Sequence, residues 1–312
     1  MRGMFRFLFS RLISTLIVVL GVSTLVFSLI HLVPGDPVEV MLGESAQAAD
    51  RDALRAALGL DKALHVQYAQ YLKGLAHLDL GQSMHSRRPV AELLAERIPA
   101  TVALSLAALA IALLIALPLG VVAAVRRDTI WDFSASGFAL LGVSIPNFWM
   151  GPLLILGFSL GLGWFPVSGR DAPGSLVLPA LTLGTSMAAI LSRMIRSTLL
   201  DVLGEDFIRT ARAKGLSRFQ VVVGHGLRNA LLPVITLVGL QLGTLLGGAV
   251  ITETVFSWPG VGLLTIEAIQ GRDYPIVQAS VLLISLTYVL VNTMTDLIYA
   301  WVDPRVRLGP DS

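Results

Sequence analysis

Basic side chains are concentrated in one short part of this chain. Of its 23 lysines and arginines, seven fall within 36 consecutive residues between two long apolar runs. They are Arg193, Arg196, Arg209, Arg212, Lys214, Arg218 and Arg228. In so apolar a chain, this pattern predicts charged helices outside the lipid, on the side of the membrane where positive charge accumulates. A segment of this kind is suited to binding another protein.

The centre of this basic stretch has the signals of two short helices. Asp206 is expected to cap a helix that runs to Lys214, and Gly215 suits the left-handed residue that follows a helix. Ser217 and Gln220 have the spacing of a capping box, which predicts the start of a second helix. The predicted apolar side consists of Ile208, Ala211, Phe219, Val222 and Val223. Such a pair either rests on anionic lipid headgroups or inserts into a groove of a cytoplasmic partner.

The rest of the chain has the composition of a membrane protein. Hydrophobic residues make up 54% and charged residues 14%, against about 25% charged in soluble domains. Six uncharged runs are about long enough to cross a bilayer. They are Leu12–Val33, Thr101–Val125, Phe133–Phe165, Ser175–Ser192, Ala230–Thr252 and Tyr274–Thr295. Pro146 and Pro152 are expected to break the third run. We therefore expect an all-α integral membrane protein with six transmembrane helices.

Charge indicates how these spans are oriented. The first run is longer than a signal-peptide core and lacks a small-x-small cleavage site, so we expect it to be retained. With the N-terminus inside, the short inner segments carry 14 basic residues and the short outer segments carry two, Arg170 and Arg272. The other seven lie in the long outer segment 34–98. We expect a multi-pass protein of the bacterial cytoplasmic membrane with both termini in the cytoplasm.

The long outer segment is expected to contain short helices. These are predicted at Asp50–Leu58, with Asp50 as cap, at Val66–Leu75, and at Pro89–Arg97, with Pro89 in the first helical position. Gly59 suits the left-handed position after the first of them. His65, His77 and His85 match no metal-binding spacing, so they are interpreted as surface residues and no metal site is predicted.

Several motifs, in order, resemble those of a known family. The run from Arg209 to Ser217, followed by His225-Gly226-Leu227-Arg228-Asn229, resembles the coupling-loop signature of permeases in the peptide and nickel branch of ABC importers. The other matching motifs are Pro34-Gly35-Asp36-Pro37, Leu58-Gly59-Leu60-Asp61, Asp79-Leu80-Gly81-Gln82-Ser83, Ile145-Pro146-Asn147-Phe148, Phe256-Ser257-Trp258-Pro259-Gly260-Val261-Gly262, Arg272-Asp273-Tyr274-Pro275 and Asp303-Pro304-Arg305. The resemblance covers essentially the whole chain.

The resemblance implies a fold and a set of partners. The fold would be that of a type I ABC importer permease with an extra-cytoplasmic insertion after the first helix. Its parts would be residues 1–94, a permease domain at 95–303 with the coupling loop near 199–229, and a tail at 304–312. The partners would be a second homologous permease, two cytoplasmic ATPase subunits, an extracellular or periplasmic binding protein and the lipid bilayer, with no nucleic acid. The substrate would be di- or oligopeptides, with nickel chelates or glutathione as alternatives.

The resemblance also assigns the coupling residues. The loop would sit in a cleft of the ATPase subunit and transmit its closure to the pore. The residues concerned are Glu205, Asp206, Arg209, Thr210, Ala211, Arg212, Lys214, Gly215 and Ser217. The general family signature begins Glu-Ala-Ala, whereas Arg209 and Thr210 occupy the first two positions here. A contact made by that glutamate therefore cannot be carried over to this chain.

Other sequence features bear on the energy source. No lysine follows a glycine, so the chain lacks a P-loop. ATP and Mg²⁺ are therefore expected on partner subunits, with no cofactor and no catalytic residue in this chain. An ion-coupled secondary transporter is the alternative class; it would need buried carboxylates, and the six runs contain no acidic residue.

Glu253 and Asp296, at span ends, are interpreted as solvated charges. Glycines within Leu242–Gly248 are expected to allow close helix contact.

Overall fold

The computed structural model describes residues 2–32, 37–42, 47–57 and 59–302. These residues form helices and connecting loops, with one isolated bridge between Gln82 and Pro89. The helices are α1 (Arg2–Leu32), α2 (Pro37–Leu42), α3 (Ala48–Ala57), α4 (Leu64–Ala76), α5 (Val90–Val125), α6 (Ile130–Ser144), α7 (Asn147–Leu154), the π-helix η1 (Ile155–Gly161), α8 (Val177–Leu203), α9 (Asp206–Ala213), the π-helix η2 (Gln220–Leu227), α10 (Arg228–Val255), α11 (Val261–Gly271) and α12 (Tyr274–Val302).

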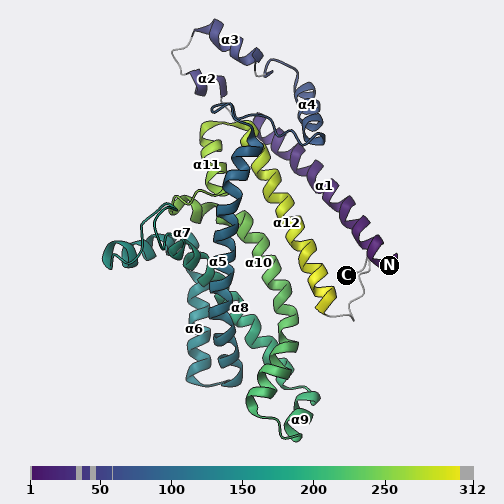
Figure 1. Ribbon diagram of the computed structural model, residues 1–312, viewed down its shortest axis with the longest axis vertical. Coiled ribbons are helices and arrows are strands. Elements are labelled where there is room, and N and C mark those ends of the chain that lie inside the picture. Colours follow the sequence, from purple (N-terminus) through teal and green to yellow (C-terminus); the bar gives the residue numbers. More distant parts are fainter. Residues whose placement is uncertain (1, 33–36, 43–46, 58, 303–312) are drawn as a thin grey trace.

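The long helices form one elongated bundle (Figure 1). Helix α5 packs against α8, α8 against α10, and α10 against α12, while α1 lies along α12 and α6 along α8. The short helix α9 projects from one end of the bundle. Helices α2, α3, α4 and α11 lie toward the opposite end. The basic stretch and the long insertion therefore occupy opposite ends of the molecule.

Each predicted apolar run falls on a helix. Four spans of the described chain are long and apolar enough to cross a membrane, namely α5, the continuous η2–α10 segment, α8 and α12. Helices α6 and α7–η1 add a fifth if the bent pair counts as one span. Helix α1 contains the shorter apolar stretch Ile13–Ser28 within a helix of 31 residues. The predicted all-helical membrane fold is confirmed.

The third run is bent by 103° between α6 and α7. The break falls at Ile145 and Pro146, as predicted, because a residue before proline avoids the helical region and Ile145 has an extended backbone. The break predicted at Pro152 was wrong, since this proline lies inside α7. The wider π-helical turns of η1 begin three residues later, at Ile155.

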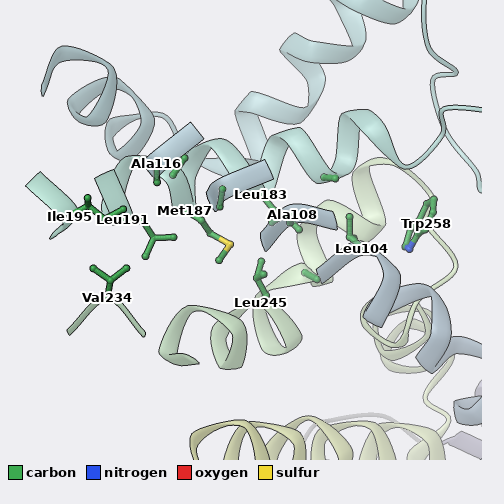
Figure 2. Close-up of a cluster of buried hydrophobic side chains, with 14 of the residues drawn as sticks. Leu104, Ala108, Ala116, Leu183, Met187, Leu191, Ile195, Val234, Leu245 and Trp258 are labelled. Atoms are coloured by element: carbon green, nitrogen blue, oxygen red, sulfur yellow. The ribbon is translucent and has the colours of Figure 1, made fainter. Parts of the chain in front are cut away.

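Small residues let α5 and α8 approach closely. Ala108, Ala112 and Ala116 of α5 are fully buried in the main core, and Figure 2 shows Ala108 and Ala116 among larger side chains of α8 and α10. A Cβ atom on Gly184 would lie 2.8 Å from the backbone oxygen of Ala108. Because lipid is as apolar as these side chains, such close backbone contact is what holds membrane helices together.

Glycine serves the same purpose between α10 and α12. A Cβ atom on Gly243 would lie 2.9 Å from the ring of Tyr288, and one on Gly239 would overlap Thr295. Close helix contact was predicted for the glycines within Leu242–Gly248. At Gly243 this contact is made inside the chain.

The insertion after α1 agrees with prediction in part. Helix α4 matches the predicted Val66–Leu75, and Gly59 has the expected left-handed backbone, with φ of +69°. Asp50 lies in the first turn of α3, so it is not the cap that was predicted. The predicted helix Pro89–Arg97 is the beginning of α5, which continues past Pro99 into the second span, with Pro89 at the N-cap. Leu58 and the turn at residues 34–36 lie outside the described residues.

Two of the short motifs meet at this end of the bundle. The Ser83 hydroxyl donates a hydrogen bond of 2.5 Å to the buried carboxylate of Asp273, and the His85 ring lies 2.6 Å from the carbonyl oxygen of Gly271. The three histidines of the insertion are exposed, as predicted. The turn between α11 and α12 thereby anchors the segment that precedes α5.

Candidate functional site

The candidate site is the segment between α8 and α10, at the end of the bundle where α9 projects (Figure 1). Helix α8 ends at Leu203, where the segment begins, and η2 continues directly into α10. The candidate residues are therefore held between two helices that cross the bundle.

Helix α9 begins differently from the prediction. Glu205 occupies the N-cap position without a side-chain capping bond, and Asp206 is the first helical residue. The prediction that Asp206 caps the helix was therefore wrong, because its own backbone is helical. Its carboxylate instead lies 3.2 Å from the guanidinium of Arg209. Negative charge in the first turn still stabilises the helix through its dipole.

Helix α9 ends as predicted. Gly215 has φ of +79°, in the left-handed region. Its N–H donates to the carbonyl oxygen of Arg212 at 3.0 Å, and the N–H of Leu216 donates to that of Ala211 at 3.4 Å. This pair of bonds is a Schellman motif, which satisfies the last carbonyl groups and turns the chain sharply.

The second helix starts with the predicted capping box. The N–H of Gln220 donates to the Ser217 hydroxyl at 3.4 Å, and the N–H of Ser217 donates to the Gln220 side-chain oxygen at 3.0 Å. The helix that follows is the π-helix η2 rather than an ordinary α-helix. The two turns together fix the direction in which α9 points.

The apolar side of the pair was predicted correctly only in part. Ile208, Ala211 and Val222 are buried as expected, together with Val221. Phe219 is 74% exposed and Val223 is 39% exposed, so placing them on the buried side was wrong. Val223 lies within η2, where a π-helix has more than the 3.6 residues per turn that the prediction assumed and therefore turns different side chains inward. Phe219 lies just before η2.

The polar candidate residues lie together on the surface. Eight of the nine are exposed, and Ala211 alone is buried. The exposed ones are Glu205, Asp206, Arg209, Thr210, Arg212, Lys214, Gly215 and Ser217. The buried side of α9 packs on Val221 and Leu216, so the charged side faces away from the bundle. This surface is charged and lies at the projecting end of the bundle.

Two members of the basic stretch bind the bundle instead. Arg218 donates to the carbonyl oxygen of Val125, at the end of α5, at 3.2 Å. Arg196 makes two hydrogen bonds to the carboxylate of Asp132, at 2.6 and 2.8 Å, and only 5% of the Asp132 side chain is exposed. This pair, missed by the sequence analysis, joins α6 to α8. An acidic residue at the edge of an apolar run was the only signal for it.

Glu253 differs most from its prediction. It is fully buried, whereas a solvated charge was predicted. The Thr101 hydroxyl and the N–H of Leu263 donate to its carboxylate at 2.7 and 3.0 Å. It is buried because the chain reverses after α10 and α11 packs over the end of that helix. Asp296 remains 40% exposed and forms an ion pair with Arg11 of α1.

Comparison with known protein families decides between the two function classes that the sequence left open. A model of the "Binding-protein-dependent transport system inner membrane component" matches residues 116–308, which is more than half of the chain. A second model, of the N-terminal part of such membrane components, matches residues 4–105. This chain belongs to the family of binding-protein-dependent inner membrane components. It is a permease of the ABC importer class. The alternative interpretation, an ion-coupled secondary transporter, is therefore rejected.

Individual relatives of this permease agree over nearly its whole length. The dipeptide transport system permease protein DppB of Escherichia coli (strain K12) is 45% identical over 97% of this chain and 99% of its own. The glutathione transport system permease protein GsiC of Salmonella typhimurium (strain LT2) is 44% identical with the same coverage.

A solved structure shares the fold of the permease. A chain of the inward-facing MetNI methionine ABC transporter matches with a TM-score of 0.59 and 23% identity, over 68% of this chain and 97% of its own. The predicted fold of a type I ABC importer permease is confirmed.

Proposed function

We propose that this permease forms half of the pore of an ATP-driven importer and carries di- or oligopeptides, including glutathione, into the cytoplasm. ATP and Mg²⁺ would bind to two cytoplasmic ATPase subunits, and a second homologous permease would complete the pore. A binding protein outside the cell membrane would deliver the substrate. Similarity to a dipeptide permease and a glutathione permease over nearly the whole chain supports this class of substrate.

The observation that carries the coupling role is the exposed, charged surface of α9. Ile208 and Ala211 anchor this helix to the bundle, while Arg209, Arg212 and Lys214 are exposed. A short amphipathic helix held in this way is suited to a groove on a partner protein. The nine coupling residues assigned from the sequence remain our proposal for the ATPase contact.

The basic segment around α9 also supports the predicted orientation of the protein in the membrane. Positive charge accumulates on the cytoplasmic side of membrane proteins, and the basic segment lies at one end of the bundle. We place this end and both termini in the cytoplasm, and we place α2, α3, α4 and α11 on the outer side. A reporter that is active only in the cytoplasm, fused after Ser312, should then be active.

Charge reversal on α9 tests the coupling role. The double variant Arg212→Glu/Lys214→Glu should reduce co-purification of the ATPase subunits about tenfold. A partner surface that is complementary to basic side chains would repel the two introduced carboxylates. The matched control is Lys62→Glu/Lys73→Glu, which reverses two exposed lysines at the opposite end. Both variants are reconstituted with the ATPase subunits and the binding protein, and ATP hydrolysis and dipeptide uptake are measured.

Lipid composition separates this role from simple membrane attachment. The measurement is repeated in vesicles with and without anionic lipid. If α9 only rests on headgroups, charge reversal will alter the dependence on anionic lipid and leave ATPase binding unchanged. That outcome would remove the coupling role from this segment.

A further inference from the structure

Glu253 is a fully buried carboxylate in the last turn of α10. In the described part of the chain, no lysine or arginine forms an ion pair with it. Burying an unpaired carboxylate is costly unless hydrogen bonds hold it.

The hydrogen bonds of Glu253 join three helices. One carboxylate oxygen accepts from the hydroxyl of Thr101, in α5, at 2.7 Å. The other accepts from the N–H of Leu263, in the first turn of α11, at 3.0 Å. The Thr101 hydroxyl oxygen also accepts from the N–H of Val261 at 2.9 Å. Glu253 and Thr101 thus satisfy backbone donors that the first turn of a helix leaves without partners.

The turn between α10 and α11 is shaped around this carboxylate. A Cβ atom on Gly260 would lie 2.2 Å from a carboxylate oxygen of Glu253, and one on Gly262 would lie 2.9 Å from the other. The indole N–H of Trp258, between them and α10, donates to the carbonyl oxygen of Ala100 at 2.8 Å. Two consecutive residues of α5 therefore hold this turn, and only glycine leaves room for the carboxylate.

Glu253 is also connected to the coupling segment through the helix that carries it. The helical path from Gln220 to Val255, through η2 and α10, has no break. It begins beside the capping box of Ser217 and ends at the carboxylate. This path joins the segment that carries α9 to the opposite end of the bundle, where Glu253 holds α11.

We propose that Glu253 is a positioning residue of transport: its carboxylate joins the outer ends of α5, α10 and α11 into one unit, so that movement driven at α9 moves α11 at the outer mouth of the pore. This inference rests on the proposed function. The carboxylate and the Thr101 hydroxyl that it binds fix the rotation of α11, because the N–H groups of Leu263 and Val261 must keep their direction. Packing alone would hold the helices together without setting that rotation.

The test compares variants that change only this bonding. Glu253→Gln keeps the shape but removes the charge, and its single amide oxygen can accept from either the Thr101 hydroxyl or the N–H of Leu263, so at least one of the present bonds is lost. Thr101→Val removes the bridging hydroxyl, and Thr101→Ser, the matched control, keeps it. The chain contains no cysteine, so Leu114→Cys and Ile269→Cys give two unique sites for spin labels on exposed positions of α5 and α11.

The measurements use the complete transporter with its ATPase subunits. We expect Glu253→Gln and Thr101→Val to broaden the distance distribution between the two spin labels and to lower uptake about tenfold, since each loses bonds to a charged acceptor. Co-purified ATPase and hydrolysis without binding protein should stay within about twofold of the parent in all variants, because α9 is unchanged. Thr101→Ser should behave like the parent.

Two results would overturn the inference. One is an unchanged distance distribution and unchanged uptake in Glu253→Gln. The other is loss of ATPase binding together with folded yield in Glu253→Gln and Thr101→Val, which would mean that the network only supports folding. The spin-label distances need no transported substrate, so an error in the substrate assignment leaves this test intact. Failure of the coupling role would instead appear as normal ATPase binding after charge reversal on α9.

Discussion

The contact between α5 and α8 and the exposed segment around α9 show two opposite uses of small and charged residues. In the first, alanines and glycines bring two backbones together, and Ala108, Ala112 and Ala116 are fully buried. In the second, a helix of eight residues keeps only Ile208 and Ala211 buried and exposes its charges. Helix α8 belongs to both regions, since its last residues lead into the segment.

The difference follows from the surroundings of each region. Within lipid, helices gain little from burying apolar side chains, so close backbone contact supplies the attraction. Outside lipid, charged side chains are solvated and can be exposed at little cost, which leaves them available for a partner. A close-packed pair can carry a displacement, and an exposed helix joined to it can receive one. Four substitutions, given from the largest expected effect to the smallest, test this comparison.

Adding a branched side chain to the close-packed pair should have the largest effect. Gly184→Val places atoms against the backbone of α5 and should destabilise the permease by about 3 kcal/mol. The matched control is Gly137→Val in α6, where no neighbouring atom lies within 4 Å of the added Cβ. Thermal unfolding in detergent, followed by gel filtration, measures the difference. Equal melting temperatures for both variants would contradict the role of close packing.

Removing the ion pair between α6 and α8 should come next. Arg196→Gln leaves the carboxylate of Asp132 buried without its partner, and we expect a loss of about 2 kcal/mol. The double variant Asp132→Asn/Arg196→Gln should recover part of this loss, because no charge then remains buried. The same unfolding assay applies. A double variant that is less stable than Arg196→Gln would contradict the explanation that the unpaired buried carboxylate causes the loss of stability.

Changing the turn after α9 should alter coupling more than stability. Gly215→Val forces a branched residue into the left-handed region, at a cost of about 1 kcal/mol or more, and should redirect the second helix. Gly224→Val in η2 is the control, since its backbone is not left-handed and an added Cβ meets nothing within 4 Å. We expect ATP hydrolysis to continue while uptake falls in Gly215→Val only. Normal uptake by Gly215→Val would contradict a role of this turn in coupling.

Removing one capping bond should have the smallest effect. Ser217→Ala deletes the hydroxyl that accepts from the N–H of Gln220 and should cost about 0.5–1 kcal/mol. Ser217→Thr keeps this acceptor and serves as the control. Hydrogen exchange at the start of η2 measures the change, with faster exchange expected in Ser217→Ala only. Equal exchange in both variants would exclude a contribution from the capping bond.

Local signals in the sequence determined much of this protein. The six apolar runs predicted the apolar helices, Pro146 predicted the bend between α6 and α7, and Gly215 and Ser217 predicted both turns beside α9. These features depend on a residue and its near neighbours. The motif order also predicted the family, to which the family model and the relatives assign the chain.

Only the tertiary structure decided which charged residues are exposed and which are held. Arg196 and Arg212 belong to the same basic stretch, yet Arg196 binds Asp132 and Arg212 is exposed. Glu253 and Asp296 both lie near span ends, yet Glu253 alone is covered by a helix that follows it in the chain. Each outcome depends on segments far apart in sequence, and the number of charges in a run does not contain that information. The π-helical winding of η2, in which Val223 is exposed, likewise differs from the regular 3.6-residue period that the sequence pattern suggested.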